Sequence, residues 1–337
     1  MVTKIKFMIN KDSKLVENIF ETEALEQGST RDGFGKGVLE AGKEDENVVV
    51  LCADLAESTR SHWFKEEFPA RYIEIGVAEQ NLATVASGLA NYGKVSFITS
   101  YAAFSPGRNN EQIRTTISLS NLPVKVCGMH AGVSVGPDGA THQMLEDIAL
   151  MRAQPNMTVI YPCDVEEARK ATLASAKTKT PTYLRFARSN TPMFTTKDSP
   201  FEIGKAELLW KEKDPQATII ACGPLLYKAL VAAEELSREG ISLLVLNNHT
   251  IKPMDTEAVL RCAKASGAVV TVEEHQVNGG MGSAVAEVLA KEYPVPMEFI
   301  GVQDQFGQSG EPEELIEHYG MGVSAIKEAV KKVIERK

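Results

Sequence analysis

The densest group of chemically capable residues lies in one glycine-rich segment, HAGVSVGPDGATHQ, at positions 130–143. It contains His130, Asp138 and His142, side chains that can move protons or bind hydroxyl groups. Zinc is a poor interpretation, because His130 and His142 are far apart in the sequence. From composition alone, a ligand-binding loop and a structural glycine-rich turn with solvated histidines remain about equally open.

Glu79 is a second candidate, because it stands where an apolar run passes into an alanine-rich helical pattern, RYIEIGVAEQNLATVASGLA (71–90). Burying a carboxylate is costly unless it is paired or neutralised. Two interpretations follow: a chemical reagent in a dry crevice, or an acid that caps the first helical turn and is stabilised by the helix dipole. Without further information the cap is favoured.

Arg31, Ser58 and Arg188 form a third group. Arg31 follows two residues typical of helix caps, Ser58 lies just past a predicted strand, and Arg188 follows the run TYLRFA. Each one alone is typical of a surface residue. Together they suit a substrate phosphate, since guanidinium groups bind its oxygens bidentately. The segment STRDGFGKG fits neither a P-loop nor a dinucleotide fingerprint.

Short β-branched runs that alternate with helical patterns must position these residues. Strands are predicted at 47–53, 72–77, 95–100, 123–129, 157–162 and 182–187. This alternation predicts an α/β fold of two doubly wound domains with mostly parallel sheets. We expect an N-terminal extension at 1–24, a first domain at 25–190, a linker at 191–204 and a smaller domain at 205–337. The segment 130–143 would then follow the carboxyl end of a strand, where open parallel sheets bind ligands.

Composition limits the function classes. The 337 residues carry a formal charge of −9, which argues against nucleic-acid binding. No apolar run approaches a membrane span, and the first residues lack a signal-peptide core. Five scattered cysteines, in no close pair, predict reduced core thiols and a cytoplasmic location.

Four motifs, EIGVAEQN, HAGVSVGPDGATHQ, MLEDIALMR and VIYPCDVEEA, resemble the pyrimidine-binding domain of transketolase. TVEEHQVNGGMGS resembles the family's C-terminal domain, so the resemblance runs from about residue 20 to the end. It implies thiamine diphosphate as cofactor. By resemblance, Glu79 hydrogen-bonds a ring nitrogen of the cofactor's aminopyrimidine and thereby promotes deprotonation of the thiazolium carbon. With the resemblance, the interpretation of Glu79 as a chemical reagent is favoured over its interpretation as a helix cap.

The same resemblance gives the other candidates their roles. His130 and His142 would contact the sugar near the reacting carbon, and Asp138 would bind the hydroxyl next to the carbonyl. Arg31, Ser58 and Arg188 would hold the sugar phosphate, with help from His130.

Tyr101 and Phe104 would pack around the pyrimidine, although a plain core role stays open for both. Asp54 matches an acidic position beside the cofactor, with a buried cap as the rival interpretation. Asn110 stands where a further aromatic residue is common in the family, after an apparent insertion near Gly107.

The family's diphosphate anchor, a Gly-Asp-Gly motif followed by an asparagine, ligates a divalent metal such as Mg²⁺. Gly-Asp-Gly does not occur in this sequence, and we therefore expect no metal ligand from this chain. The resemblance then implies the C-terminal subunit of a split transketolase. An N-terminal subunit would supply the metal half of the site in an α2β2 heterotetramer, which would transfer a two-carbon ketol unit between sugar phosphates.

Four alternatives remain. One is another transketolase-like enzyme that acts on a different ketose. The beta subunit of a 2-oxoacid dehydrogenase shares the two-domain plan but has no need for phosphate-binding arginines. Deoxyxylulose-phosphate synthase is normally one long chain with its own metal motif. A non-catalytic structural or regulatory subunit would not need Glu79 together with His130, Asp138 and His142. His275, in the C-terminal motif, is interpreted as a packing residue rather than as part of an anion site.

Overall fold

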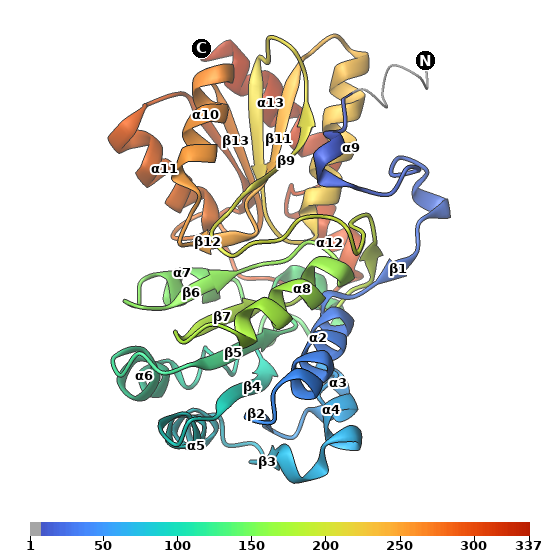
Figure 1. The fold of residues 1–337 in the computed structure, drawn as a ribbon. Coiled ribbons are helices and arrows are strands. Elements are labelled where there is room, and N and C mark those ends of the chain that lie inside the picture. The colour runs from blue at the N-terminus through green and yellow to red at the C-terminus, as the bar shows by residue number, and fades with distance from the viewer. Residues whose placement is uncertain (1–7) are drawn as a thin grey trace.

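The computed structural model describes residues 8–337 as two α/β layers of strands and helices stacked on each other (Figure 1). The first sheet has seven strands in the order β12-β6-β7-β5-β4-β2-β3, and all its pairings are parallel except that of β12 with β6. The second has five strands, β14-β13-β10-β11-β9, with only β9 antiparallel. The predicted α/β class with mostly parallel sheets is confirmed.

The six strands predicted for the first domain are all present, with shorter bounds for most of them. The strands are β2 (Val48–Cys52), β3 (Tyr72–Glu74), β4 (Val95–Tyr101), β5 (Val124–Met129), β6 (Thr158–Ile160) and β7 (Thr182–Arg185). The helices are α2 (Thr30–Glu44), α3 (Ala56–Thr59), α4 (His62–Glu67), α5 (Glu79–Asn91), α6 (Asn110–Gln112), α7 (Asp147–Arg152) and α8 (Val165–Ala176). A π-helical turn spans Ile113–Ser118, and 3₁₀ turns span Pro69–Arg71 and Val133–Asp138.

The second domain contains β9 (Glu207–Lys211), β10 (Ala217–Ala221), β11 (Leu243–Asn247), β12 (Thr250–Lys252), β13 (Val269–Gln276) and β14 (Met297–Val302). Its helices are α9 (Leu225–Arg238), α10 (Thr256–Ser266), α11 (Met281–Glu292), α12 (Pro312–His318) and α13 (Val323–Glu335). Strand β12 follows β11 in the chain but pairs with β6, so the second half of the chain completes the first sheet.

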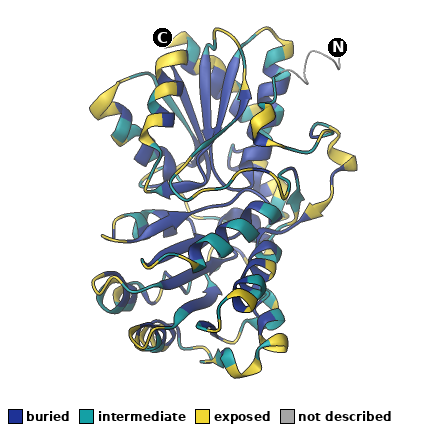
Figure 2. Ribbon diagram, in the orientation of Figure 1, coloured by how far each residue is buried: buried dark blue, intermediate teal, exposed yellow. Residues whose placement is uncertain are grey.

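The apolar core is continuous between the two layers. Val159 of β6, Ile220 of β10 and Leu246 of β11 belong to one buried cluster. The inner strands of both sheets are buried along almost their whole length, whereas β3, β9 and β14 are only partly buried (Figure 2). Because a strand covered on both faces needs apolar residues at every position, β2 reads VVVLC and is buried throughout. This shared core fixes the two layers against each other.

The start of the described chain packs on the second domain. Ile9 bridges to Trp210 of β9, Ile19 is buried in the second domain's core, and short 3₁₀ turns span Lys11–Ser13 and Thr22–Ala24. The chain then forms β1 (Gln27–Gly28), which pairs with β8 (Thr191–Pro192) in the predicted linker. No helix within residues 8–337 has both the length and the apolar character needed to cross a membrane.

Candidate functional site

The candidate residues collect where the parallel strands of the first sheet end. Glu79 begins the helix that follows β3, Tyr101 is the last residue of β4, His130 comes directly after β5, and Arg188 follows β7. Neighbouring parallel strands end at the same edge, so residues from four segments of the chain meet there. The site is built from the loops at this edge.

Glu79 is only 2% exposed, although it is the first residue of α5. Its Oε2 accepts a hydrogen bond from Nη1 of Arg108 at 2.6 Å, and the Arg108 side chain is 49% exposed. Asn109 Nδ2 donates to the backbone oxygen of Glu79 at 2.9 Å. The guanidinium of Arg108 also lies over the ring of Phe104, with its carbon 4.7 Å from the ring centroid. Arg108 therefore links the buried carboxylate to the face of the Phe104 ring at the edge of the sheet.

Four rings continue the site from Glu79 toward the 130–143 segment. Tyr101 stacks on His130 with 4.2 Å between centroids and on Phe104 with 6.1 Å. His142 meets Phe104 edge-on at 5.3 Å and Tyr101 at 6.1 Å. The expectation that these residues share one site is consistent with this cluster, whereas their roles toward a ligand remain predictions.

His130 is 2% exposed and in contact with a cation. Its Nε2 lies 3.1 Å from Nη1 of Arg31, which can only donate, so Nε2 is the acceptor. Burial, together with the positive charges of Arg31 and Arg188, lowers the pKa of His130 to about 3. The ring is thus neutral near pH 7 and carries its hydrogen on Nδ1. Among the described residues, this buried Nδ1 has no hydrogen-bond partner.

Basic groups surround the outer end of the ring cluster. Arg31 Nη1 donates to the backbone oxygen of Ser58 at 3.1 Å, which brings Ser58 to the site through its backbone. Burial and the nearby charge of Arg60 lower the pKa of Arg31. Arg188 donates to the backbone oxygen of Val135 at 2.7 Å and lies 3.5 Å from Oδ2 of Asp138. An anion at this end would meet several guanidinium groups.

Asp54 and Asn110 are the two remaining residues that the sequence analysis singled out in the first domain. Asp54 is exposed and has a positive φ of 58°. Its backbone nitrogen donates a hydrogen bond to Oε1 of Glu74 at 2.8 Å. The interpretation of Asp54 as a buried cap is therefore wrong, because its side chain faces solvent. Asn110 begins α6 and lines a pocket of about 490 Å³ with Arg114 and Leu119, in which none of the four rings takes part.

The VEEH motif in the second domain has a structural explanation. Glu273 accepts hydrogen bonds from the backbone nitrogens of Met281 and Gly282 at 2.6 and 2.8 Å, so the start of α11 already holds an anion from its own chain. His275 is fully buried, and its Nδ1 lies 2.7 Å from the backbone oxygen of Gln276. The packing interpretation of His275 agrees with this burial.

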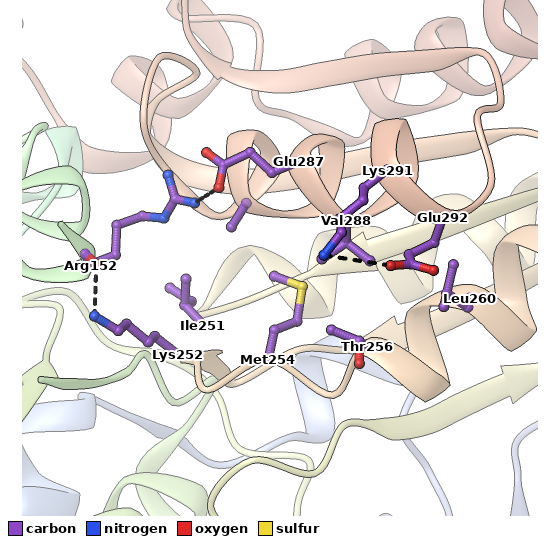
Figure 3. Close-up of a pocket in the computed structure, with 11 residues that line it drawn as sticks. Arg152, Ile251, Lys252, Met254, Thr256, Leu260, Glu287, Val288, Lys291 and Glu292 are labelled. Carbon is purple, nitrogen blue, oxygen red and sulfur yellow. Dashed lines mark hydrogen bonds and ion pairs between the residues drawn. The ribbon is translucent and has the colours of Figure 1, made fainter. Parts of the chain in front are cut away.

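A pocket of about 730 Å³ lies elsewhere, between the two layers (Figure 3). An ion pair of 2.6 Å between Arg152 and Glu287 closes one end of it, and Ile251, Met254 and Val288 line its apolar floor. None of the candidate residues lines this pocket. Its volume therefore says nothing about the chemistry at Glu79.

Sequence reasoning missed Arg108 and Asn109, although both stand in SYAAFSPGRNNEQIR (100–114), the stretch that also contains Tyr101 and Phe104. An arginine in a loop carries no sequence signal of its own, because its partner depends on the path of the loop. Within the described residues, no group of three or more histidines, cysteines, aspartates or glutamates could hold a metal ion. A buried carboxylate that an arginine links to an aromatic face does suit a planar heterocycle that hydrogen-bonds through a ring nitrogen.

The chain matches two family models, the transketolase pyrimidine-binding domain over residues 26–193 and the transketolase C-terminal domain over residues 204–326. It is 44% identical over 299 residues to a putative transketolase C-terminal section from Methanocaldococcus jannaschii, covering 88% of this chain and 93% of that protein.

It is also 40% identical over 313 residues to a 6-deoxy-6-sulfo-D-fructose transketolase subunit from Clostridium sp., covering 93% of this chain and 97% of that one. A solved split-gene transketolase, described as an inactive beta4 tetramer, superposes with a TM-score of 0.85 at 43% identity, covering 91% of this chain and 98% of that one. The chain therefore belongs to the transketolase family and corresponds to the C-terminal section that split transketolases carry as a separate subunit.

Proposed function

We propose that this chain is the C-terminal subunit of a two-chain, thiamine diphosphate-dependent transketolase. With an N-terminal subunit it transfers a two-carbon ketol unit from a ketose phosphate to an aldose phosphate. The observation that carries the proposal is the buried Glu79 carboxylate, which Arg108 links to the Phe104 ring, while Phe104 and Tyr101 contact His142 and His130. When bound, the cofactor supplies a nucleophilic carbon that adds to the sugar's carbonyl group.

The residues of this chain have separate tasks in the proposed reaction. Glu79 exchanges a proton with a ring nitrogen of the cofactor. Tyr101 and Phe104 pack around the pyrimidine ring of the cofactor and hold it in place. His130 donates from its unpartnered Nδ1 to a sugar oxygen, and His142 contacts the same part of the sugar. Asp138 accepts from the hydroxyl next to the carbonyl and thereby selects its stereochemistry.

The anionic end of the sugar lies between Arg31 and Arg188, near Ser58. Since both arginines also hold backbone oxygens of the site, they are fixed in place before an anion arrives. Asp54 is exposed, and we propose for it only a position beside the cofactor. The Mg²⁺ and diphosphate contacts are assigned to the N-terminal subunit, in an α2β2 assembly located in the cytoplasm.

Reconstitution tests the proposal. The chain is mixed with an N-terminal transketolase subunit, thiamine diphosphate and Mg²⁺, and ketol transfer from xylulose 5-phosphate to ribose 5-phosphate is measured. We expect activity with both chains and none with either chain alone. Transfer by the purified single chain, or no transfer by a stable complex of both chains on any ketose phosphate, would overturn it.

A second donor class is favoured by one relative, whose name assigns it to 6-deoxy-6-sulfo-D-fructose. A sulfonate carries a negative charge and three oxygens, so Arg31 and Arg188 could bind it as they would bind a phosphate. Competition between a phosphorylated and a sulfonated ketose in the same assay separates the two. The preferred donor is the one with the higher kcat/KM.

A further inference from the structure

The loop that carries the donor-binding residues is held from the second domain. It runs from His130 to His142 and includes a 3₁₀ turn, Val133–Asp138. Oε1 of Glu274, at the end of β13, accepts a hydrogen bond from the backbone nitrogen of Ser134 at 2.6 Å. Glu274 is 1% exposed, so this bond lies in the dry boundary between the two layers. A charged acceptor on a backbone N–H is among the stronger hydrogen bonds in proteins.

The glycine before Ser134 makes this contact possible. Gly132 has a φ of 92°, a conformation that other residues rarely adopt, and a Cβ at this position would run into the Glu274 carboxyl group. The single glycine of the HAGVS motif thus allows the close approach of a carboxylate from the second domain. The HAGVS motif and the VEEH segment therefore contact each other directly, through Gly132 and Ser134 on one side and Glu274 on the other.

A second set of hydrogen bonds, made by Gln143, fixes the same loop farther along the chain. Gln143 Nε2 donates to the backbone oxygens of Val133, Gly136 and Gln308, at 3.0, 3.2 and 2.9 Å. Gln308 belongs to the segment that leads to α12, and Pro312 of that helix lies against Gly136. The loop is therefore fixed at both ends of its 3₁₀ turn by residues of the second domain.

The other side of the loop is held by the end of the first domain. Ser189 Oγ donates to the backbone oxygen of Ser134 at 2.7 Å, and Arg188 donates to that of Val135. Ser134 thus has its nitrogen bound to Glu274 and its oxygen bound to Ser189. Neither Glu274 nor Ser189 is among the residues assigned to substrate binding, so both would act through the loop.

We propose that Glu274 is a positioning residue for donor binding: it fixes the loop that places His130, Asp138 and His142 around the sugar. This rests on the proposed function for the identity of the donor, whereas the ordering of the loop by Glu274 does not. The second domain then contributes to affinity for the donor without contacting it. A loop that populates the competent conformation less often binds its ligand more weakly by the same factor.

The neighbouring Glu273 provides a matched control. It lies on the same strand, is equally buried, and binds two backbone nitrogens of α11 instead of the loop. Glu274→Ala and Glu273→Ala both remove a buried carboxyl group from β13. Only the first one releases Ser134. Glu274→Gln, which keeps an acceptor oxygen and the side-chain volume, serves if the alanine variant fails to fold.

Hydrogen exchange on the full chain and kinetics of the reconstituted enzyme test the proposal together. We expect Glu274→Ala to speed exchange of the Ser134 amide about tenfold or more and to raise KM for the donor by a similar factor. The acceptor KM and the cofactor dissociation constant stay unchanged, and Glu274→Gln restores part of the donor affinity. Glu273→Ala should leave both readouts at wild-type values.

Unchanged exchange at Ser134 in both Glu274 variants would overturn the proposal, as would a donor KM that rises equally in the Glu273 variant. If exchange speeds up while no complex transfers a ketol unit, the proposed function fails and the role of Glu274 in ordering the loop stands. The two conclusions can thus be separated by the exchange measurement.

Discussion

Arg108 donates to the carboxylate of Glu79 at 2.6 Å, and this pair joins a half-exposed guanidinium to an almost fully buried acid. Asn109, the next residue, holds the backbone oxygen of Glu79. One short loop after β4 therefore fixes the acid through both its side chain and its backbone. The free energy of this pair can be measured without cofactor or partner.

We expect Arg108→Met to lower the free energy of unfolding by about 1–3 kcal/mol, because it leaves a buried carboxylate without its counter-charge. In a Glu79→Gln background the same substitution should cost much less. Urea unfolding of the isolated chain gives the four stabilities of a double-mutant cycle, with an expected coupling of about 1–2 kcal/mol. A coupling near zero would mean that the exposed guanidinium is solvated rather than paired.

Glu79→Gln should reduce kcat of the reconstituted enzyme by about 100-fold or more, because an amide keeps the shape of the side chain but cannot exchange a proton. The measurement is ketol transfer at saturating cofactor. Glu111→Gln, an exposed acid in the nearby α6, is the control and should keep wild-type activity. Full activity of the Glu79 variant would favour the helix-cap interpretation and a non-catalytic subunit.

His130 gives the stability of the chain a defined pH dependence. Its pKa is lowered to about 3 in the folded state, chiefly by burial, against 6.5 for an ordinary histidine. Between these two values the unfolded chain binds a proton at this position that the folded chain does not. Stability contributed by the neutral ring is therefore present above pH 6.5 and is lost as the pH falls, by up to roughly 1.4 kcal/mol per pH unit.

His130→Asn removes this titration. We expect the slope of unfolding free energy against pH, between pH 6.5 and 4, to be smaller than the wild-type slope by about one proton. Comparing the two proteins cancels the contributions of other buried groups, such as Glu273, whose pKa is raised to about 7 by burial. Equal slopes for the two proteins would show that His130 is protonated to the same extent in both states.

Part of this site could be predicted from the sequence for a physical reason. The β-branched runs fix the strands, strand order in a parallel sheet brings their carboxyl ends together, and the 130–143 segment follows one of those ends. The segment that contains His130 and Asp138 was therefore predicted to follow the carboxyl end of a strand, and it follows β5 in the structure. Asp54 also follows a strand, but its positive φ turns it to solvent, and no sequence pattern specifies such a turn.

The contacts across the layers could not be predicted in this way. Glu274 and Ser134 are 140 positions apart, and their meeting depends on how two separately patterned sheets pack. Strand β12 shows the same limit, because it lies within the predicted second domain at 205–337 and yet pairs with β6 of the first. Periodicity assigns a residue to an element and a face, but the partner across an interface comes from packing.

The ion pair of Asp147 and Arg185 offers a way to test how tightly the two layers pack on each other. Their atoms Oδ2 and Nε lie 2.7 Å apart with both side chains fully buried, and Tyr183 donates to the same oxygen at 2.5 Å. His275 of the second domain lies 3.9 Å from the other oxygen, Oδ1. The group thus sits where the two layers meet.

Asp147→Asn should lower the free energy of unfolding by about 3–5 kcal/mol, because it leaves the Arg185 cation buried without an opposite charge. Glu287→Gln breaks the pair with Arg152 at the pocket between the layers, where Glu287 is 66% exposed, and should cost less than about 1 kcal/mol. Denaturant unfolding of the isolated chain measures both. Equal small losses would mean that water reaches Arg185 when Asp147 is neutralised, and the boundary between the layers would then be wet rather than sealed.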